Sequence, residues 1–140
     1  DQIIDYSLHN SRAQIFKAAI PPGAVSAVGA ALDILDSEPE RRQQLWDNTN
    51  YMKRELEGLG FETCGSQSPV IPLLIGDDVA TYMMATRLQE EGVFVNAVVT
   101  PAVPPGHGVI RTSYMATHTR EHLDQALGAI ARVGRELSVI

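Results

Sequence analysis

The chain has 140 residues and a mass of 15.2 kDa, enough for one domain with a hydrophobic core. Apolar residues make up 44% of the chain and charged residues 20%, the balance of a globular protein rather than a disordered or membrane-embedded one. The formal net charge of -6 argues against nucleic acid as a partner, because a surface that binds a phosphate backbone carries a basic stripe.

The first part of the chain predicts two helices separated by an extended segment. Residues 1–10 have the pattern of a helix that continues from upstream, and residues 13–16 form a short strand candidate. The run Pro21-Pro22-Gly23 breaks regular structure, since proline restricts both itself and the residue before it. Residues 24–35 are almost all small or apolar, which predicts a helix buried on several sides.

A second long helix follows a capping signal. Ser37-Glu38-Pro39-Glu40 matches the capping box, and apolar residues at helical spacing continue until Gly60 ends the helix. Two short strands are expected next, over residues 61–64 and 70–75, around a Gly-Ser-Gln-Ser-Pro connection.

The last part of the chain predicts a helix, two strands and a final helix. Asp77 or Asp78 caps the first helix, which is closed by Gly92 and is expected to direct Tyr82, Met83 and Leu88 inward.

The two strands, over residues 93–99 and 109–115, are joined by a loop rich in proline and glycine. Thr119 then caps the last helix. The short connections favour antiparallel neighbours, so we expect an α/β (α+β) fold with a small, mostly antiparallel sheet covered by helices on one face.

Arg111 is the most informative single position. Strand alternation places it on one face with Val109 and Ser113, and Ile110, Thr112 and Tyr114 on the other. A guanidinium can bind a carboxylate through two parallel hydrogen bonds, which suits it to the α-carboxylate of an amino acid. The residues alone favour the other reading, an arginine on the solvated face of a half-exposed sheet, because surface charge is the norm.

Other reactive side chains give no pattern of a catalytic or metal site. His107, His118 and His122 lack acidic or cysteine ligands at zinc spacing, so we expect capping or surface roles and no metal. The single cysteine, Cys64, allows no intrachain disulfide, which fits a reducing cytoplasm. No apolar run is long enough for a membrane span.

Several segments together resemble the C-terminal part of the α-oxoamine synthases, a family of fold type I pyridoxal phosphate enzymes. The resemblance is carried by order and spacing from Phe16 to Thr119. The matching stretches are Phe16 to the Pro21-Pro22 turn, Ala30-Ala31-Leu32-Asp33-Ile34-Leu35, Gly60-Phe61, the run SQSPVIPLLIG from Ser66 to Gly76, Glu91-Gly92-Val93-Phe94-Val95, Pro101-Ala102-Val103-Pro104, Ile110-Arg111-Thr112-Ser113 and Ala116-Thr117-His118-Thr119.

The resemblance implies how the chain is organised and what it binds. Residues 1–22 would end a large cofactor domain, and residues 23–140 would form the C-terminal small domain with its long connecting helix. Arg111 would bind the carboxylate of an amino-acid substrate. Lys17 and Ala18 lie near the segment where the family contacts the cofactor phosphate, although the small hydroxylated residues usual there are absent.

The resemblance further implies a homodimer that condenses an amino acid with an acyl thioester to an α-amino ketone, using pyridoxal phosphate. The lysine that holds the cofactor lies in the family's large domain, so this chain alone would contain no catalytic residue and would be inactive. Two alternatives remain open: a free-standing small-molecule-binding module without catalysis, and part of another fold type I enzyme such as an aminotransferase.

Overall fold

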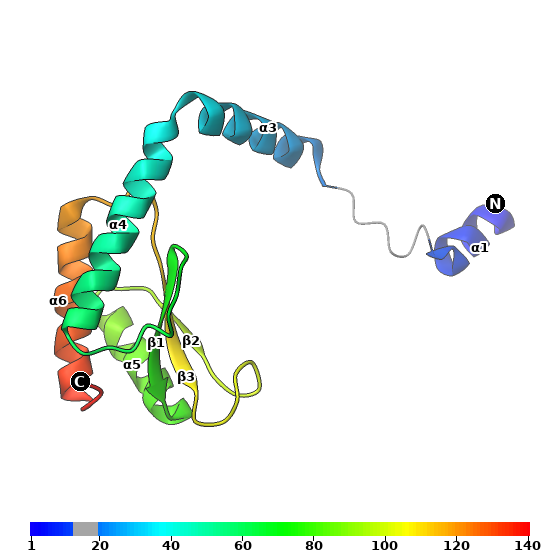
Figure 1. Ribbon diagram of the computed structural model, residues 1–140. Coiled ribbons are helices and arrows are strands. Elements are labelled where there is room, and N and C mark those ends of the chain that lie inside the picture. The colour runs from blue at the N-terminus through cyan, green and yellow to red at the C-terminus, as the bar shows by residue number, and fades with distance from the viewer. Residues whose placement is uncertain (13–19) are drawn as a thin grey trace. The chain divides into compact units, whose positions relative to one another are not determined.

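A computed structural model describes residues 1–12 and 20–140, which divide into two compact units, Asp1–Glu38 and Pro39–Ile140 (Figure 1). The first unit contains α1, Gln2–Asn10, and α3, Pro22–Ser37. The helix expected over residues 1–10 is confirmed, whereas the strand expected over 13–16 lies outside the described residues.

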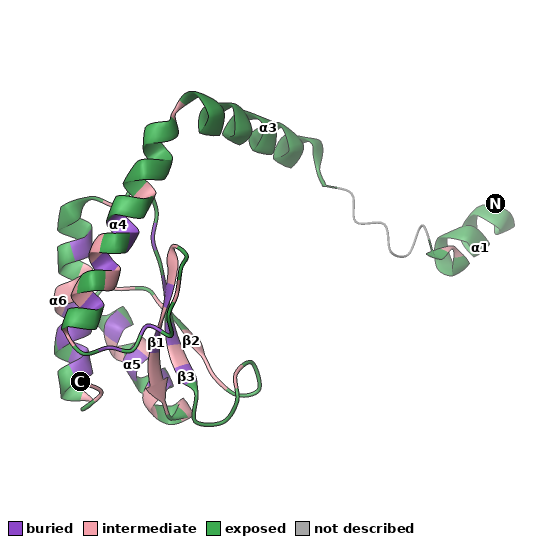
Figure 2. Ribbon diagram, viewed as in Figure 1, coloured by how far each residue is buried: buried purple, intermediate pink, exposed green. Residues whose placement is uncertain are grey.

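The helix α3 begins at Pro22, which occupies its first turn, where a missing N–H leaves no hydrogen bond unmade. Every residue of this helix is exposed (Figure 2). The predicted burial on several sides is therefore wrong for the described part of the chain. An apolar helix surface favours contact with another protein segment, but its residues are buried only where such a segment covers them.

The second unit opens with α4, Pro39–Gly58, whose inner face carries Thr49, Met52 and Leu56. The predicted capping box is wrong. Ser37 is the last residue of α3, and α4 begins only at Pro39. The Ser37 hydroxyl donates to the carbonyl oxygen of Asp33 at 2.8 Å, within α3, rather than accepting from the first turn of α4. Gly60, with a φ of +102°, turns the chain after the helix, a conformation that glycine adopts without strain.

The segment 61–64 is irregular, although a strand was expected there. It makes one backbone hydrogen bond to the sheet, from the Leu74 N–H to the Glu62 carbonyl oxygen at 2.9 Å. Cys64 and Gly65 then adopt positive φ angles of 52° and 64°, which turn the chain away before a second bond of a ladder can form. Phe61 and Thr63 are nevertheless buried.

Three antiparallel strands form the sheet in the order β1-β3-β2: β1, Val70–Gly76, β3, Gly108–Ser113, and β2, Asn96–Val98. The central strand β3 places Arg111 opposite Pro72 of β1 and opposite Asn96 of β2. The strand expected over residues 93–99 is shorter than predicted, because residues 93–95 do not pair with β3.

The helices α4, α5 and α6 lie on one side of the sheet, as expected (Figure 1). The core between them is entirely within the second unit. Its fully buried large side chains are Met52, Leu56, Ile71, Leu73, Met84, Leu88, Ile110, Ile130 and Val133.

Both predicted helix caps are confirmed in this unit. The Asp77 carboxylate accepts a hydrogen bond from the Ala80 N–H at 2.9 Å and begins α5, Asp78–Glu90. Thr119 begins α6, Arg120–Glu136, where its hydroxyl accepts from the His122 N–H at 3.3 Å. Both caps satisfy N–H groups that a helix leaves unpaired at its start.

The predicted inner face of α5 is only partly correct. Leu88 is buried, but Tyr82 and Met83 are 57% and 50% exposed. Thr81 and Met84 occupy the inner positions instead, since they lie on the same helix face as Leu88 at spacings of three and four residues.

Candidate functional site

The candidate site lies on the face of the sheet that α4, α5 and α6 leave uncovered. Side chains alternate along each strand, so the residues of this face are those not used for the core. Most of them are apolar and half-buried: Val70, Pro72 and Leu74 from β1, Val98 from β2 and Val109 from β3.

Arg111 stands at the centre of this apolar surface, as strand alternation predicts. Across the ladder it is flanked by Pro72 on one side and by Asn96 on the other. Within the described part of the chain, the Arg111 side chain has no hydrogen bond, ion pair or ring contact. A guanidinium held among apolar groups, with its five N–H donors available, is well placed to bind a carboxylate or phosphate group.

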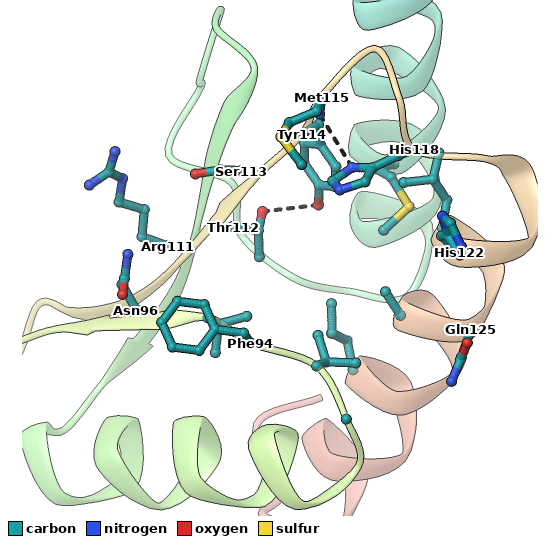
Figure 3. A pocket seen from close by; sticks show the side chains of 17 residues that line it. Phe94, Asn96, Arg111, Thr112, Ser113, Tyr114, Met115, His118, His122 and Gln125 are labelled. Carbon is teal, nitrogen blue, oxygen red and sulfur yellow. Dashed lines mark hydrogen bonds between the residues drawn. The ribbon is translucent and has the colours of Figure 1, made fainter. Parts of the chain in front are cut away.

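A cavity of about 580 Å³ opens beside Arg111 at the edge of the sheet (Figure 3). The cavity lies where the sheet ends, because β2 is short and residues 92–95 do not pair with β3. Residues 92–95, the end of β3 and α6 form its walls. Its inner wall is apolar and reaches the core residues Met52, Leu123 and Ile130.

Polar groups gather at two ends of this cavity. Arg111 and Asn96 project at one end, with Ser113 beside them on β3, and His118, His122 and Gln125 lie at the other end (Figure 3). Among the described residues that line the cavity, Arg111 is the one arginine or lysine, so its end is the part that would attract an anionic ligand group.

The two histidines at the far end have structural roles. The Nδ1 atom of His118 accepts a hydrogen bond from the Met115 N–H at 3.2 Å, and that of His122 accepts from the Thr119 N–H at 3.4 Å. The capping role expected for this cluster is confirmed for His122, which completes the capping box of α6.

The end of β3 is fixed by two buried polar contacts. The Thr112 hydroxyl donates to the Ile71 carbonyl oxygen at 2.8 Å and lies 2.9 Å from the Tyr114 hydroxyl. Burial raises the pKa of Tyr114 to about 12, because desolvation disfavours the phenolate. Tyr114 is therefore a neutral packing residue at physiological pH rather than a base.

Lys53, the lysine of the described region, has its amine engaged by neighbouring oxygen atoms. The Lys53 Nζ donates to the Ser66 carbonyl oxygen at 2.7 Å and lies 4.0 Å from a Glu57 carboxylate oxygen. Lys17 and Ala18, predicted near a phosphate contact, lie outside the described residues.

Asn96 is the site residue that sequence reasoning missed. Its segment was correctly expected to be extended, but the position opposite Arg111 depends on the register between two strands. Local patterns of apolar and polar residues do not fix that register, because the exposed face of β2 has only two residues. The polar interruption in the run Val93 to Val99 was the one available signal.

No helix in the described ranges, 1–12 and 20–140, has both the length and the apolar character needed to cross a bilayer. Residues 1–130 match the family model of aminotransferase class I and II. The chain is 44% identical over 138 residues to 8-amino-7-oxononanoate synthase of Symbiobacterium thermophilum, covering 99% of this chain and 35% of that relative. It is 42% identical over 137 residues to serine palmitoyltransferase of Sphingobacterium spiritivorum, covering 98% and 34%.

A solved structure shows the same likeness. Serine palmitoyltransferase from S. paucimobilis with bound PLP–myriocin aldimine aligns with a TM-score of 0.83 and 28% identity, covering 100% of this chain and 36% of that one. The chain thus spans about a third of the length of the relatives that it matches.

Proposed function

Because the chain belongs to the aminotransferase class I and II family, and within it to the α-oxoamine synthases, we propose that it is the substrate-binding part of a longer, pyridoxal-phosphate-dependent acyltransferase. Its small antiparallel sheet with helices on one face is that of fold type I enzymes, as the sequence predicted. The proposal concerns the reaction, the substrates and the role of Arg111.

The proposed reaction joins an amino acid to an acyl thioester. In the decarboxylating form, the amino acid loses carbon dioxide, its α-carbon forms a bond to the acyl carbonyl carbon, and the thiolate leaves with the electron pair of the carbon–sulfur bond. The product is an α-amino ketone. The names of the two relatives, an oxononanoate synthase and a palmitoyltransferase, support an acyl transfer of this kind.

One observation carries the assignment of the substrate site. Arg111 has no partner among the described residues for its guanidinium, which lies in the middle of an apolar sheet face, beside a cavity of about 580 Å³. A bidentate pair between this guanidinium and the α-carboxylate would fix the orientation of the substrate. Holding reacting groups in the correct orientation lowers the activation barrier.

The described residues suit binding of the substrate carboxylate, but they offer no free lysine amine for the aldehyde of the cofactor. Pyridoxal phosphate, when bound through a lysine amine, acts as an electron sink for a carbanion at the α-carbon. Lys53 is engaged by Ser66 and Glu57, so we assign the cofactor-holding groups to other parts of the longer protein. This chain by itself would be inactive.

The longer protein is further proposed to be a cytoplasmic homodimer. A single, exposed cysteine, Cys64, is compatible with a reducing compartment, in which structural disulfides are rare. The uncovered apolar sheet face around Arg111 is the kind of surface that another domain or subunit covers.

The test uses the full-length protein, purified with its cofactor. Arg111→Ala should raise the KM for the amino acid by at least about 30-fold, because truncating one partner of a desolvated charge pair costs on the order of 2–5 kcal/mol. The KM for the acyl thioester should stay unchanged. Arg132→Ala, which removes an exposed arginine paired with Glu91, is the matched control.

Three outcomes would contradict the proposal. An amino-acid KM that is unchanged in Arg111→Ala would remove the assignment of the carboxylate site. Amino-group transfer without consumption of acyl thioester would identify an aminotransferase. A full-length protein that binds amino acids but turns over nothing would identify a binding module.

A further inference from the structure

Asn96 is the polar cross-strand neighbour of Arg111 on the uncovered sheet face. The two residues are directly opposite each other in the antiparallel pair of β2 and β3. Residues so paired have Cβ atoms about 4.5–5.5 Å apart and project to the same side of the sheet. Figure 3 shows both side chains at the same end of the cavity.

Within residues 1–12 and 20–140, the Asn96 side chain has no hydrogen bond to any other group. Its amide therefore has two N–H donors and an acceptor oxygen available, in the immediate neighbourhood of an arginine that also has no partner. Both side chains are exposed, so a carboxylate placed between them would replace water as their hydrogen-bond partner.

We infer that Asn96 is a second carboxylate-positioning residue: its amide N–H donates a hydrogen bond to the same substrate carboxylate that Arg111 binds. This inference rests on the proposed function and deepens it. Arg111 would provide the charge, and Asn96 would fix the plane of the carboxylate relative to the sheet. A hydrogen bond from a second strand prevents the carboxylate from rotating about the axis that joins it to the guanidinium.

The chemistry of the amide explains why asparagine suits this position. An aspartate opposite Arg111 would pair with the guanidinium and compete with the incoming carboxylate, whereas a neutral amide leaves the positive charge free. The amide oxygen can also accept an N–H from Arg111 while the amide nitrogen donates to the substrate. Both contacts are within reach of one cross-strand pair.

The other neighbours of Arg111 on this face are less suited to this role. Pro72, opposite Arg111 on β1, has no side-chain donor. Ser113 lies two residues along the same strand and is paired with Val70, so it is not directly opposite Arg111 as Asn96 is.

The experiment compares Asn96→Leu with the unaltered full-length protein. The substitution keeps the approximate size of the side chain and removes every donor. The primary readout is the equilibrium dissociation constant, measured by calorimetry, for the amino acid among glycine, alanine and serine that the protein turns over. We expect a 10- to 100-fold weaker binding, which is about the effect of one hydrogen bond to a charged group.

Three further readouts separate ligand positioning from a structural role. The KM for the acyl thioester and the Tm should not change. Binding of the corresponding amino-acid amide, which lacks the carboxylate, should be weakened less than two-fold by Asn96→Leu. Asn50→Leu, the same change at an exposed site of α4 outside the cavity, should alter none of these values.

Amino-acid binding within two-fold of the unaltered protein, or an equal loss for the amino acid and its amide, would overturn the inference. The result for Arg111→Ala separates this failure from failure of the proposed function. If Arg111→Ala weakens amino-acid binding and Asn96→Leu does not, the carboxylate site stands and only the role of Asn96 is wrong. If neither does, the proposed site itself is wrong.

Discussion

The side-chain amide of Asn48 donates a hydrogen bond to the backbone carbonyl oxygen of His118, 2.9 Å away and 70 residues later in the chain. The same Nδ2 atom donates to the carbonyl oxygen of Met115 at 3.0 Å. Asn48 is 6% exposed, so these bonds are largely shielded from water. One residue of α4 thus fixes both ends of the turn that links β3 to α6.

Replacing Asn48 with alanine should reduce the free energy of unfolding by about 2–3 kcal/mol, because two carbonyl oxygens lose a buried donor. Urea denaturation followed by circular dichroism measures the change. Asn50→Ala, two residues along α4 at an exposed position, should change stability by less than about 0.5 kcal/mol. Equal effects of the two substitutions would contradict the buried-donor explanation.

Tyr114 should make the protein sensitive to alkaline pH. Its pKa is raised from 10.0 to about 12 by burial, so the folded state retains a proton that the unfolded state loses. The stability linked to this group is fully present below pH 10 and is lost as the pH rises from 10 towards 12. The Tyr114→Phe variant lacks this dependence.

The measurement is the difference in unfolding free energy between the unaltered protein and Tyr114→Phe, at pH 8 and at pH 11.5. The difference should shift by about 2 kcal/mol in favour of the phenylalanine variant at the higher pH, since one pKa unit corresponds to about 1.4 kcal/mol. The exposed tyrosines cancel in this comparison. A difference that does not vary with pH would show that Tyr114 titrates normally.

Two glycines of α6 should respond to alanine in opposite ways. A Cβ atom at Gly134 would lie 2.7 Å from the Phe61 ring and 3.2 Å from the Ile140 side chain, closer than packed atoms approach. Gly134→Ala should therefore destabilise the protein by about 1–3 kcal/mol through overpacking. A Cβ atom at Gly128 meets only the end of the flexible Arg132 side chain, at 3.5 Å.

Gly128→Ala should stabilise the protein by about 0.5–1 kcal/mol, because alanine loses less backbone entropy in a helix than glycine. Thermal unfolding of both variants under the same conditions provides the test. If Gly134→Ala were also stabilising, the packing of Phe61 against α6 would have to be looser than the structure indicates.

Local signals in the sequence were sufficient for most of the helices and for the position of Arg111. Asp77 and Thr119 were identified as caps because capping depends on residues within one helical turn. Arg111 was placed on the opposite face from Ile110 by alternation alone, and the burial of Ile110 confirms it.

Features that depend on distant partners could not be obtained in this way. The segment 61–64 has the composition of a strand, but it makes one backbone hydrogen bond with β1, through the Glu62 carbonyl oxygen. The pairing of Asn96 with Arg111, and the cavity beside them, follow from where β2 leaves β3, which no local pattern encodes. The apolar surface of α3 was recognised, but its exposure was not, because local composition does not tell whether another element covers a helix.

The outer edge of β1 has a consequence for how the protein behaves at high concentration. N–H groups alternate across a strand, and the Leu74 N–H points outward to Glu62, so residues 70, 72 and 74 share that edge. Pro72 has no N–H, and the Val70 N–H is bonded to the Ser68 hydroxyl at 3.3 Å. A strand from another molecule therefore finds no free donor among these three residues, so this edge does not template the intermolecular sheets that lead to amyloid-like aggregates.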